Sequence, residues 1–281
     1  MTSHDDQIAL LQQRYGSQTK PNNIHWTPQV EAMLSHRSVR TFLSKPLPEG
    51  ALETMIAAAQ SASNSSALNQ WSLVAVTDSE LKQKISNTVA LTVPTDRIPW
   101  IEEAPVLLLW VADLSRSEKI TKEQGGDPIV LDYLDSFLMA SIDTSLAAQN
   151  ASLAAESMRL GVVFLGVMRN AAEEIAKIVN LPSYSFITFG MAVGHPDPSR
   201  FSSIRPRPAQ PMVLHHNYYQ SNEFTSYLEK YEESLFDFRV KQGMKIKTWQ
   251  EAVYSAATSM KYMGGREKLR QTVTKKGFKL L

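Results

Sequence analysis

Apolar residues gather in four stretches whose pattern is typical of β-strands. The stretch PVLLLWVAD at 105–113 is apolar up to its final Asp113, which predicts a strand in the centre of a sheet. Shorter apolar stretches at 71–78, 162–168 and 185–196 predict three further strands.

Between the strands, apolar positions recur at helix spacing. In the stretch EGALETMIAAAQSAS at 49–63, Leu52, Met55, Ile56 and Ala59 fall on one face, which predicts a helix with that face buried.

A short helix is predicted before it. Thr27 is a suitable N-cap and Pro28 suits the first helical position, so this helix is expected to run to about Ser35.

The longest helix is predicted over 128–161, where Ala, Leu, Met and Ser dominate and small residues occupy both faces. Gly161 is placed to be its C′ residue. A helix over 170–182 is expected to stop at Pro182, and further helices follow the last strand. Helices and strands mix without regular β-α-β alternation, which favours an α+β fold.

The first residues are polar and mixed, and they predict an N-terminal arm over residues 1–26. The remaining residues, 27–281, are then expected to form one domain with a C-terminal helical extension. That length is sufficient for a well-buried core.

Composition narrows the possible chemistry. The chain has 281 residues, 43% of them hydrophobic and 20% charged, and its net charge is +1. Nucleic-acid-binding proteins usually carry a clear basic excess, so no nucleic-acid partner is predicted. There is no cysteine, which excludes disulfides, thiolate metal sites and cysteine nucleophiles. Any redox chemistry must therefore depend on a bound cofactor.

No export signal or membrane span is predicted. The N-terminus MTSHDDQIALLQQRYG lacks the basic start and apolar core of a secretory signal. The longest apolar-leaning stretch, 131–160, is interrupted by acidic residues and is too polar to span a bilayer. These features predict a cytoplasmic protein with no membrane partner.

A first cluster of candidate binding residues lies in the stretch SHRSVR. His36, Arg37 and Arg40 gather positive charge around Ser38. If the stretch is helical, these cations are neighbours on one surface and repel each other. An anion relieves that repulsion, and two guanidiniums with a hydroxyl suit a phosphate. The alternative is a solvated basic turn with a partner such as Glu31.

A second cluster lies in SSIRPRPAQP at 202–211. The prolines favour an extended chain, in which Arg205 and Arg207 project to the same side. Two guanidiniums that face one way again suit a phosphate. The alternatives are a surface linker and an arm that inserts into a DNA minor groove, and the near-neutral net charge disfavours the second.

Two further features suit a flat or polar ligand. A strand that ends at Gly166 allows close approach of the backbone, although a β-bulge is the alternative. The stretch SNSSALNQ offers polar side chains that suit a heterocycle or a ribityl chain, or else a helix cap and turn; they are Ser63, Asn64, Ser65, Ser66 and Asn69. No HExxH, GxGxxG, GxxxxGK[ST] or GxSxG pattern occurs, and no metal site is predicted.

Together and in this order, these motifs resemble the FMN-dependent nitroreductase family. The strings that carry the resemblance are HRSVRTF, KPLP, LETMIAAAQSASNSSALNQWSLVAVTD, DTSLAAQNASLAAESMRLGVVFLGVMRN, FGMAVGHPDP and RPRPAQPMVLHHNYYQ. The closest similarity is to the NADPH-preferring branch of flavin reductases and oxygen-insensitive nitroreductases. It covers 34–219 closely and the C-terminal part more loosely.

The resemblance implies an α+β sandwich with a mostly antiparallel sheet flanked by helices. It also implies a homodimer with FMN at the subunit interface. The residues expected by position to bind FMN are His36, Arg37, Ser38, Arg40, Asn64, Ser66, Phe164, Leu165, Gly166, Arg205 and Arg207. Both basic segments would then serve the flavin phosphate.

The resemblance further implies that NADPH or NADH donates a hydride to flavin N5. The electrons then pass to a nitroaromatic, a quinone or free flavin as small-molecule acceptor. No catalytic side chain is required, because the protein supplies position and electrostatics. Candidates for the NADPH 2′-phosphate are Arg239, Lys241, Lys245 and Lys247, and a solvated helix end is the alternative.

One position departs from the family pattern. The family often places a glutamine beside the flavin ring, whereas Ile98 stands here next to Arg97. These two residues are the candidates for the substrate side. Their identity keeps open a flavoenzyme of the same fold that is specific for one metabolite, acting by dehydrogenation or reductive dehalogenation. A non-catalytic flavin-binding protein is a further alternative.

Overall fold

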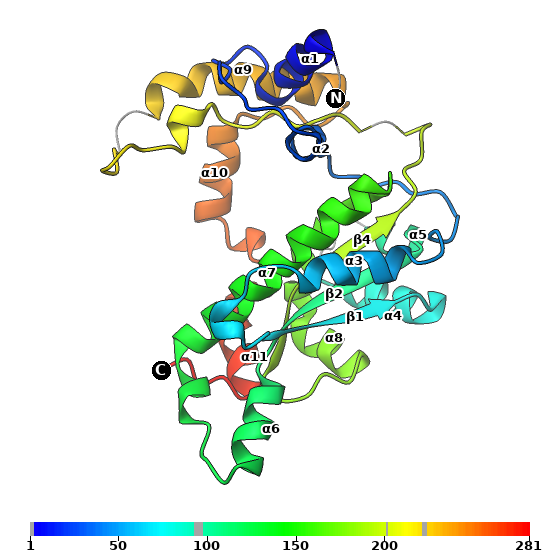
Figure 1. Ribbon diagram of the computed structural model, residues 1–281, viewed down its shortest axis with the longest axis vertical. Helices are drawn as coiled ribbons and strands as arrows, with labels where there is room; N and C mark the ends of the chain where they lie inside the picture. Colours follow the sequence, from blue (N-terminus) through cyan, green and yellow to red (C-terminus); the bar gives the residue numbers. More distant parts are fainter. Residues whose placement is uncertain (1–2, 93–97, 201, 221–223) are drawn as a thin grey trace. The chain divides into compact units, whose positions relative to one another are not determined.

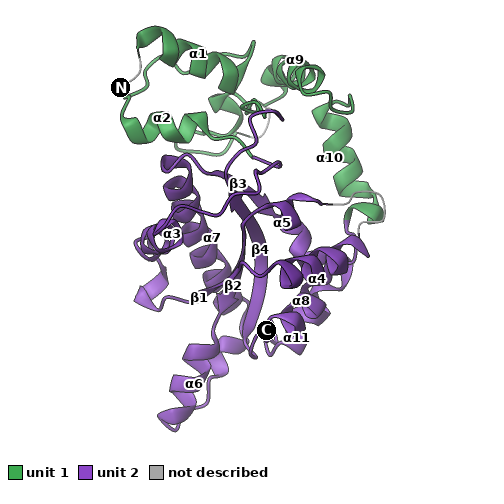
Figure 2. Ribbon diagram, turned by 90° about the vertical axis from the view of Figure 1, so that its right-hand side faces the viewer, with its two compact units in different colours: residues 1–38, 201–262 green, residues 39–200, 263–281 purple. Residues whose placement is uncertain are grey.

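The computed structural model describes residues 3–92, 98–200, 202–220 and 224–281. The chain divides into two compact units, which Figure 2 shows in different colours. Unit 1 comprises residues 1–38 and 201–262, and unit 2 comprises residues 39–200 and 263–281.

Unit 2 is built on a four-stranded antiparallel sheet with the strand order β1-β2-β4-β3. Strands β1, β2 and β4 are labelled in Figure 1, and β3 is labelled in Figure 2. Its strands are β1 (Trp71–Val76), β2 (Val106–Asp113), β3 (Gly161–Leu165) and β4 (Ser185–Gly194). All four strands were predicted, and β2 lies inside the sheet as its unbroken apolar run indicated. The helices that flank this antiparallel sheet confirm the α+β class.

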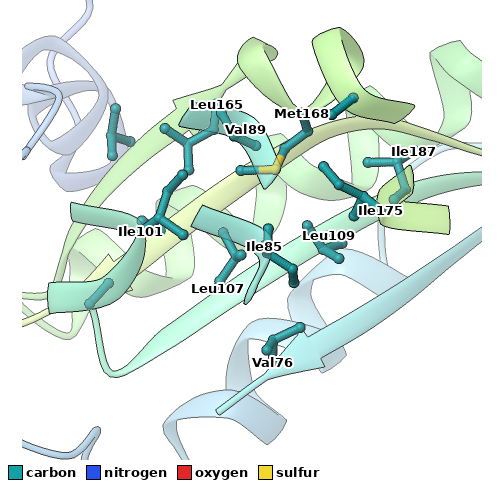
Figure 3. Packing of buried hydrophobic residues seen from close by; sticks show 14 of the residues in the cluster. Val76, Ile85, Val89, Ile101, Leu107, Leu109, Leu165, Met168, Ile175 and Ile187 are labelled. Atoms are coloured by element: carbon teal, nitrogen blue, oxygen red, sulfur yellow. The ribbon is translucent and has the colours of Figure 1, made fainter. Parts of the chain in front are cut away.

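One face of β2 supports the first core of unit 2. Leu107 and Leu109 point into it (Figure 3), together with residues of three helices and the end of β3. These helices are α4 (Ser79–Ala90), α5 (Trp100–Glu103) and α8 (Ala172–Ile178). Helix α8 ends before Pro182, in agreement with the predicted stop.

The other face of β2 supports a second core. Leu108 and Trp110 pack there against small residues of α3 (Ala51–Gln60) and α7 (Leu134–Ser157). Side chains alternate across a strand, so a strand that is apolar up to its last residue, Asp113, can contribute to the cores on both sides of the sheet.

The predicted end of the long helix was wrong. Helix α7 ends at Ser157, the chain turns at Arg159 with φ 60°, and Gly161 is the first residue of β3. A Cβ at Gly161 would lie 2.7 Å from the Cβ of Val39. The glycine therefore permits close approach of another segment and does not cap the helix.

The C-terminal segment closes a third core of unit 2, which includes Phe186, Val273 and Phe278. The Phe278 ring lies 5.2 Å from that of Phe137 and 5.6 Å from that of Tyr184. The other helices of unit 2 are α6 (Ser115–Glu123) and α11 (Leu269–Lys275). Short 3₁₀ segments of this unit cover Ser65–Ala67, Ile129–Asp132, Gly166–Ala171 and Arg266–Lys268.

Unit 1 contains the helices α1 (His4–Tyr15), α2 (Pro28–Ser35), α9 (Thr225–Lys241) and α10 (Trp249–Thr258). Its 3₁₀ segments are Gln210–Met212 and Met260–Tyr262. Helix α2 begins as predicted, because the Thr27 side chain accepts the Val30 N–H and Pro28 follows it.

Helix α1 lies within the residues predicted as an arm and was not expected. It begins with a capping box, in which Ser3 accepts the Asp6 N–H and the Asp6 carboxylate accepts the Ser3 N–H. Such reciprocal bonds satisfy two of the unpaired N–H groups of a first helical turn.

Candidate functional site

Arg205 and Arg207 lie in the segment 202–211, which the sequence identifies as a candidate phosphate-binding segment. Ile204 and Pro206 are buried whereas the two arginines are exposed, so burial alternates along the segment. This alternation is typical of an extended chain whose exposed side chains share one side. The guanidinium of Arg205 lies 5.9 Å from the centroid of the Phe238 ring, within the range of a cation–π contact.

A third arginine, Arg239 on α9, belongs to the same positive region. Its side chain is 4% exposed, its Nη1 donates to the Lys245 carbonyl at 3.4 Å, and its Nε is buried without a partner. Arg205 is exposed as a whole residue, but partial burial of its guanidinium, with the charges of Arg239 and Arg207, lowers its pKa. Burial also raises the pKa of Tyr231, and the charges of all three arginines oppose that rise.

We call Arg205, Arg207 and Arg239 the arginine cluster. Within the described part of the chain, none of the three forms an ion pair with a carboxylate. Guanidiniums that neighbour one another without an acidic partner favour an anionic ligand, since they bind phosphate oxygens in a fixed, forked geometry.

His36, Arg37 and Ser38 follow the last residue of α2. His36 has φ −50° and ψ 134°, so the helical spacing considered from the sequence does not apply here. Arg37 is exposed, as is Arg40, which falls in unit 2. Val39, which follows Ser38, is buried, and its N–H donates to the Val162 carbonyl of β3 at 2.9 Å. This contact requires an extended chain after the end of α2.

Unit 1 brings the two basic segments together through the backbone. Arg14 of α1 donates hydrogen bonds to the carbonyls of both His36 and Arg205. Sequence reasoning missed Arg14, because no motif marks an arginine whose partners are backbone carbonyls. The spacing of Ser3 and Asp6 was a usable signal for the helix that carries it.

In unit 2, the polar loop with Asn64 and Ser66 has a strained backbone. Ser66, Ala67 and Asn69 have φ values of 52°, 55° and 50°, which non-glycine residues rarely adopt. The Asn69 N–H donates to Asn64 Oδ1 at 3.3 Å, and Asn69 Nδ2 donates to the Ala67 carbonyl at 3.0 Å. Strain of this kind persists only where neighbouring groups hold it, and it is common in ligand-binding segments.

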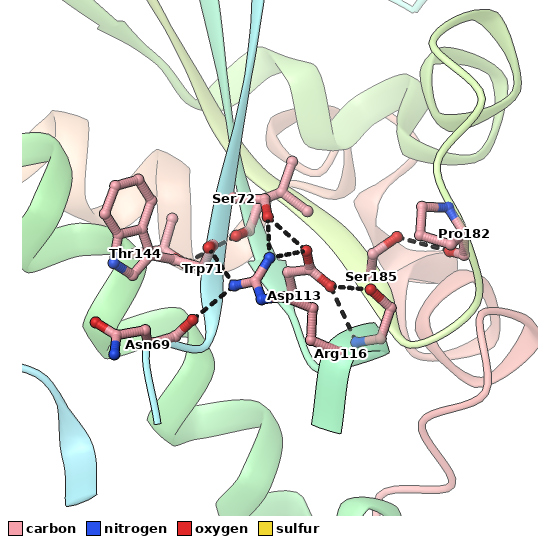
Figure 4. A network of polar contacts seen from close by, with 10 residues as sticks. Asn69, Trp71, Ser72, Asp113, Arg116, Thr144, Pro182 and Ser185 are labelled. Carbon is pink, nitrogen blue, oxygen red and sulfur yellow. Dashed lines mark hydrogen bonds and ion pairs between the residues drawn. The ribbon is translucent and has the colours of Figure 1, made fainter. Parts of the chain in front are cut away.

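Two residues outside the loop hold it, and neither was predicted. Asp143 of α7 is 1% exposed, and its Oδ1 accepts the Ser65 N–H at 2.9 Å, whereas its Oδ2 is buried without a partner. Arg116 donates to the Asn69 carbonyl at 2.7 Å and is itself held by Asp113 at 3.1 Å (Figure 4).

The end of β3 presents Phe164 and encloses Leu165. Phe164 is 38% exposed and its ring centroid lies 5.4 Å from that of Phe189. Leu165 is 5% exposed and lies in the core of Figure 3, so only its backbone is available to a ligand. A Cβ at Gly166 would lie 3.2 Å from Arg169 Nη2, so a side chain there would crowd the turn.

The candidates for the substrate side and for NADPH lie in different surroundings. Arg97 falls outside the described residues, and Ile98 is partly buried against the first core of unit 2. The lysines proposed for the NADPH phosphate, Lys241, Lys245 and Lys247, are exposed, in contrast to buried Arg239.

Among the described residues, helices long and apolar enough to cross a membrane are absent. The same residues include no group of three or more His, Asp or Glu side chains placed to hold a metal ion.

Comparison with known proteins gives a consistent family. The pattern of the nitroreductase family matches residues 33–195, and that of the nitroreductase family C-terminal domain matches residues 205–281. FMN reductase (NADPH) of Bacillus subtilis is 31% identical over 229 residues, which cover 80% of this chain and 89% of that protein. FMN reductase [NAD(P)H] of the same organism is 32% identical over 256 residues, which cover 89% of this chain and 98% of that protein.

Comparison with solved structures points to the same family. The structure of the NADPH:FMN oxidoreductase of Vibrio harveyi, complexed with NAD+, superimposes with a TM-score of 0.77 at 29% identity. The match covers 90% of this chain and 99% of that one. With more than half of its length matched by the family pattern and with relatives above 30% identity, the chain belongs to the nitroreductase family.

Proposed function

We propose that the protein is an FMN-dependent NAD(P)H oxidoreductase that passes electrons to a nitroaromatic, a quinone or free flavin. The observation that carries this proposal is the arginine cluster, which has no carboxylate partner among the described residues. A phosphate monoester supplies the negative charge that such a cluster lacks. The names of the relatives, FMN reductase (NADPH) and FMN reductase [NAD(P)H], favour FMN as its bearer.

Candidate residues for binding FMN occur in unit 1 and in unit 2. In unit 1, Arg205 and Arg207 suit the phosphate, and the segment from His36 to Ser38 offers a further guanidinium and a hydroxyl. Unit 2 offers exposed Arg40, the side chains of Asn64 and Ser66 on a strained loop, and the exposed ring of Phe164 beside Gly166.

When bound, FMN would supply the redox chemistry, a two-electron exchange between a nicotinamide nucleotide and an acceptor. The side chains of the candidate site would then bind FMN and orient its ring. The Phe164 ring offers an apolar surface to a flat ring system, and the arginine cluster keeps its positive charge for the phosphate because no described carboxylate neutralises it.

An anaerobic titration of the purified protein with NADPH, followed by absorbance, tests the proposal. The expected result is a flavin spectrum that is bleached by NADPH or NADH and restored by an acceptor. A flavin spectrum that neither nucleotide bleaches would indicate a non-catalytic flavin-binding protein. No flavin binding after incubation with FMN would overturn the proposal.

A second candidate is favoured by Ile98. This residue packs against a core instead of presenting a polar group, although its family position often carries a glutamine. The candidate is a flavoenzyme of the same fold that serves one metabolite. Reoxidation of the reduced protein by a panel of nitroaromatics, quinones and FMN separates the two, since a metabolite-specific enzyme would react slowly with all of them.

We also propose a homodimer, because α7 carries an exposed apolar stripe. Leu134, Leu138, Ile142 and Leu146 recur every four residues and are 46%, 47%, 55% and 43% exposed. Contiguous apolar surface of this kind is typical of a protein interface. In sedimentation velocity, Leu138→Glu with Ile142→Glu should give a monomer, whereas Lys119→Glu on α6 should sediment as the wild type.

A further inference from the structure

The N-terminal arm contains side chains that are unexpectedly buried. Arg14 is 6% exposed and Gln18 is 3% exposed, although the arm is polar and precedes the residues matched by the family pattern. Arginine and glutamine are seldom buried this deeply unless their donors and acceptors are used.

Arg14 joins the two basic segments. Its Nε and Nη2 donate to the Leu34 carbonyl at 3.1 and 2.6 Å, and Nη2 also donates to the His36 carbonyl at 2.7 Å. Its Nη1 donates to the Arg205 carbonyl at 3.0 Å. One guanidinium therefore fixes the end of α2 and the segment of Arg205, which are far apart in the sequence.

Gln18 of the arm also bonds to the segment that contains Arg205 and Arg207. Its Nε2 donates to the Arg207 carbonyl at 2.9 Å, and its Oε1 accepts the Ala209 N–H at 2.9 Å. The Arg207 N–H donates to the Arg14 carbonyl, also at 2.9 Å. The arm thus bonds to the backbone of residues 205, 207 and 209, in the way that a neighbouring strand uses alternate residues.

The arm is anchored in turn to α9, which carries Arg239. The Ser17 N–H donates to Ser234 Oγ at 3.2 Å, and Ser17 Oγ donates to Glu233 Oε2 at 2.8 Å. The hydroxyl of Ser234 donates to the Lys230 carbonyl at 2.8 Å and lies 3.2 Å from the Tyr15 carbonyl. The arm therefore contacts the end of α2, the segment of Arg205 and Arg207, and helix α9.

We propose that Arg14 and Gln18 are positioning residues that fix the basic segments of unit 1 for the phosphate of FMN. This proposal rests on the proposed function. The arginines of the cluster repel one another, so without a constraint their segments separate when no anion is present. Backbone hydrogen bonds from the arm hold the segments in place while leaving the side chains of Arg205 and Arg207 exposed, which lowers the entropy lost on binding.

The residue types suit this role. A planar guanidinium has five N–H donors in a fixed fork, so it can bond three carbonyls at once, whereas a lysine ammonium has a single nitrogen. The primary amide of Gln18 has both a donor and an acceptor, as a backbone peptide group does. Arg14→Lys should therefore retain the charge and lose the connection between the segments.

The test measures the dissociation constants of the apoprotein for FMN and for riboflavin, which lacks the phosphate, by quenching of flavin fluorescence. We expect Arg14→Ala, Arg14→Lys and Gln18→Ala to raise the FMN constant, by about tenfold or more for the Arg14 variants. The riboflavin constant should stay within about twofold, because only phosphate binding is affected. Exposed Gln13 on the same helix provides the control, Gln13→Ala, which should match the wild type.

Each other outcome has a separate meaning. If Arg14→Lys binds FMN as the wild type does, Arg14 acts through its charge and the positioning role is overturned. If FMN and riboflavin constants rise together, the arm only stabilises the fold, which also overturns the proposal. If wild type binds neither flavin, or binds both equally, the proposed FMN site itself fails. Should Arg14→Ala fold poorly by circular dichroism, Arg14→Lys and Gln18→Ala decide the question.

Discussion

The carboxylate of Asp143 on α7 accepts the backbone N–H of Ser65 at 2.9 Å and is 1% exposed. This bond ties the longest helix of unit 2 to a loop with three left-handed residues, which include Ser66. A buried carboxylate with one oxygen unpartnered is unfavourable by itself, and the hydrogen bond from the Ser65 N–H offsets part of that cost.

Asp143→Ala should therefore lower the free energy of unfolding by about 1–3 kcal/mol, because it leaves the Ser65 N–H without its acceptor. Asp143→Asn keeps an acceptor oxygen and should lose less. Urea unfolding of the three proteins measures the difference. Equal stability of Asp143→Ala and the wild type would show that the loop does not depend on this bond.

Replacing both Arg205 and Arg207 by alanine should release FMN during purification, since the phosphate loses two charge-assisted contacts. The flavin-to-protein absorbance ratio measures the loss. The control is Arg270→Ala on α11, where the arginine is exposed in unit 2. Full flavin content in the double variant would mean that the phosphate binds elsewhere.

Gly161→Ala should destabilise the protein by about 1–3 kcal/mol, because the new Cβ would lie 2.7 Å from the Cβ of Val39. In a Val39→Gly background the same change should be less harmful, because the Cβ and both methyl groups, which would lie 2.7 to 2.8 Å from the new atom, are then absent. Thermal unfolding of the four proteins gives the coupling. An equal loss in both backgrounds would assign the effect to the backbone alone.

The stability of unit 2 should fall in alkaline solution through Tyr184. Burial and the hydrogen bond to Asp132 raise the pKa of Tyr184 from 10.0 to about 12. The folded state then holds this proton more tightly than the unfolded chain. Its contribution is present below pH 10 and is lost as the pH rises toward about 12.

Tyr184→Phe removes that titration, together with the hydrogen bond that the hydroxyl donates to Asp132. The free energy of unfolding of the wild type, relative to Tyr184→Phe, should therefore decrease between pH 9 and pH 11.5, measured by urea unfolding. A difference that stays constant over this range would indicate that the Tyr184 hydroxyl has the same pKa in the folded and unfolded chains.

The exposed lysines after α9 should favour NADPH. Lys245→Ala with Lys247→Ala is expected to raise KM for NADPH by about threefold to tenfold, because exposed charges contribute modestly, and to leave KM for NADH unchanged. Steady-state kinetics with both nucleotides measures this. A wild type with higher kcat/KM for NADH would contradict the assignment.

The parts of the fold that the sequence predicted are those with strong periodic signals. β2 has no polar interruption, and Thr27 with Pro28 marks the start of α2, so both agree with the structure. Gly161 was predicted to cap α7, because a glycine that follows a helix usually does so. In the structure it instead leaves space for the side chain of Val39, which is distant in the sequence. No local pattern records a contact of that kind.

Some residues of the candidate site could be predicted from the sequence, and others could not. Arg205 and Arg207 could be found because charge and proline spacing are visible in the sequence. Arg14, Gln18 and Asp143 could not, because they bond to backbone N–H and carbonyl groups. Almost every residue has a backbone N–H and a carbonyl, so the residue types in the sequence do not show which side chain will bond to them.

The arginine cluster also affects how quickly ligands arrive. The chain as a whole has a net charge of +1, so its overall field is weak, yet three neighbouring guanidiniums produce a local positive potential. Association of any phosphate-bearing ligand is then faster at low ionic strength and slows as salt screens the cluster over a Debye length of about 10 Å at 0.1 M. Phosphate and sulfate buffers compete for the same guanidiniums, so chloride is the suitable counter-ion for kinetic work.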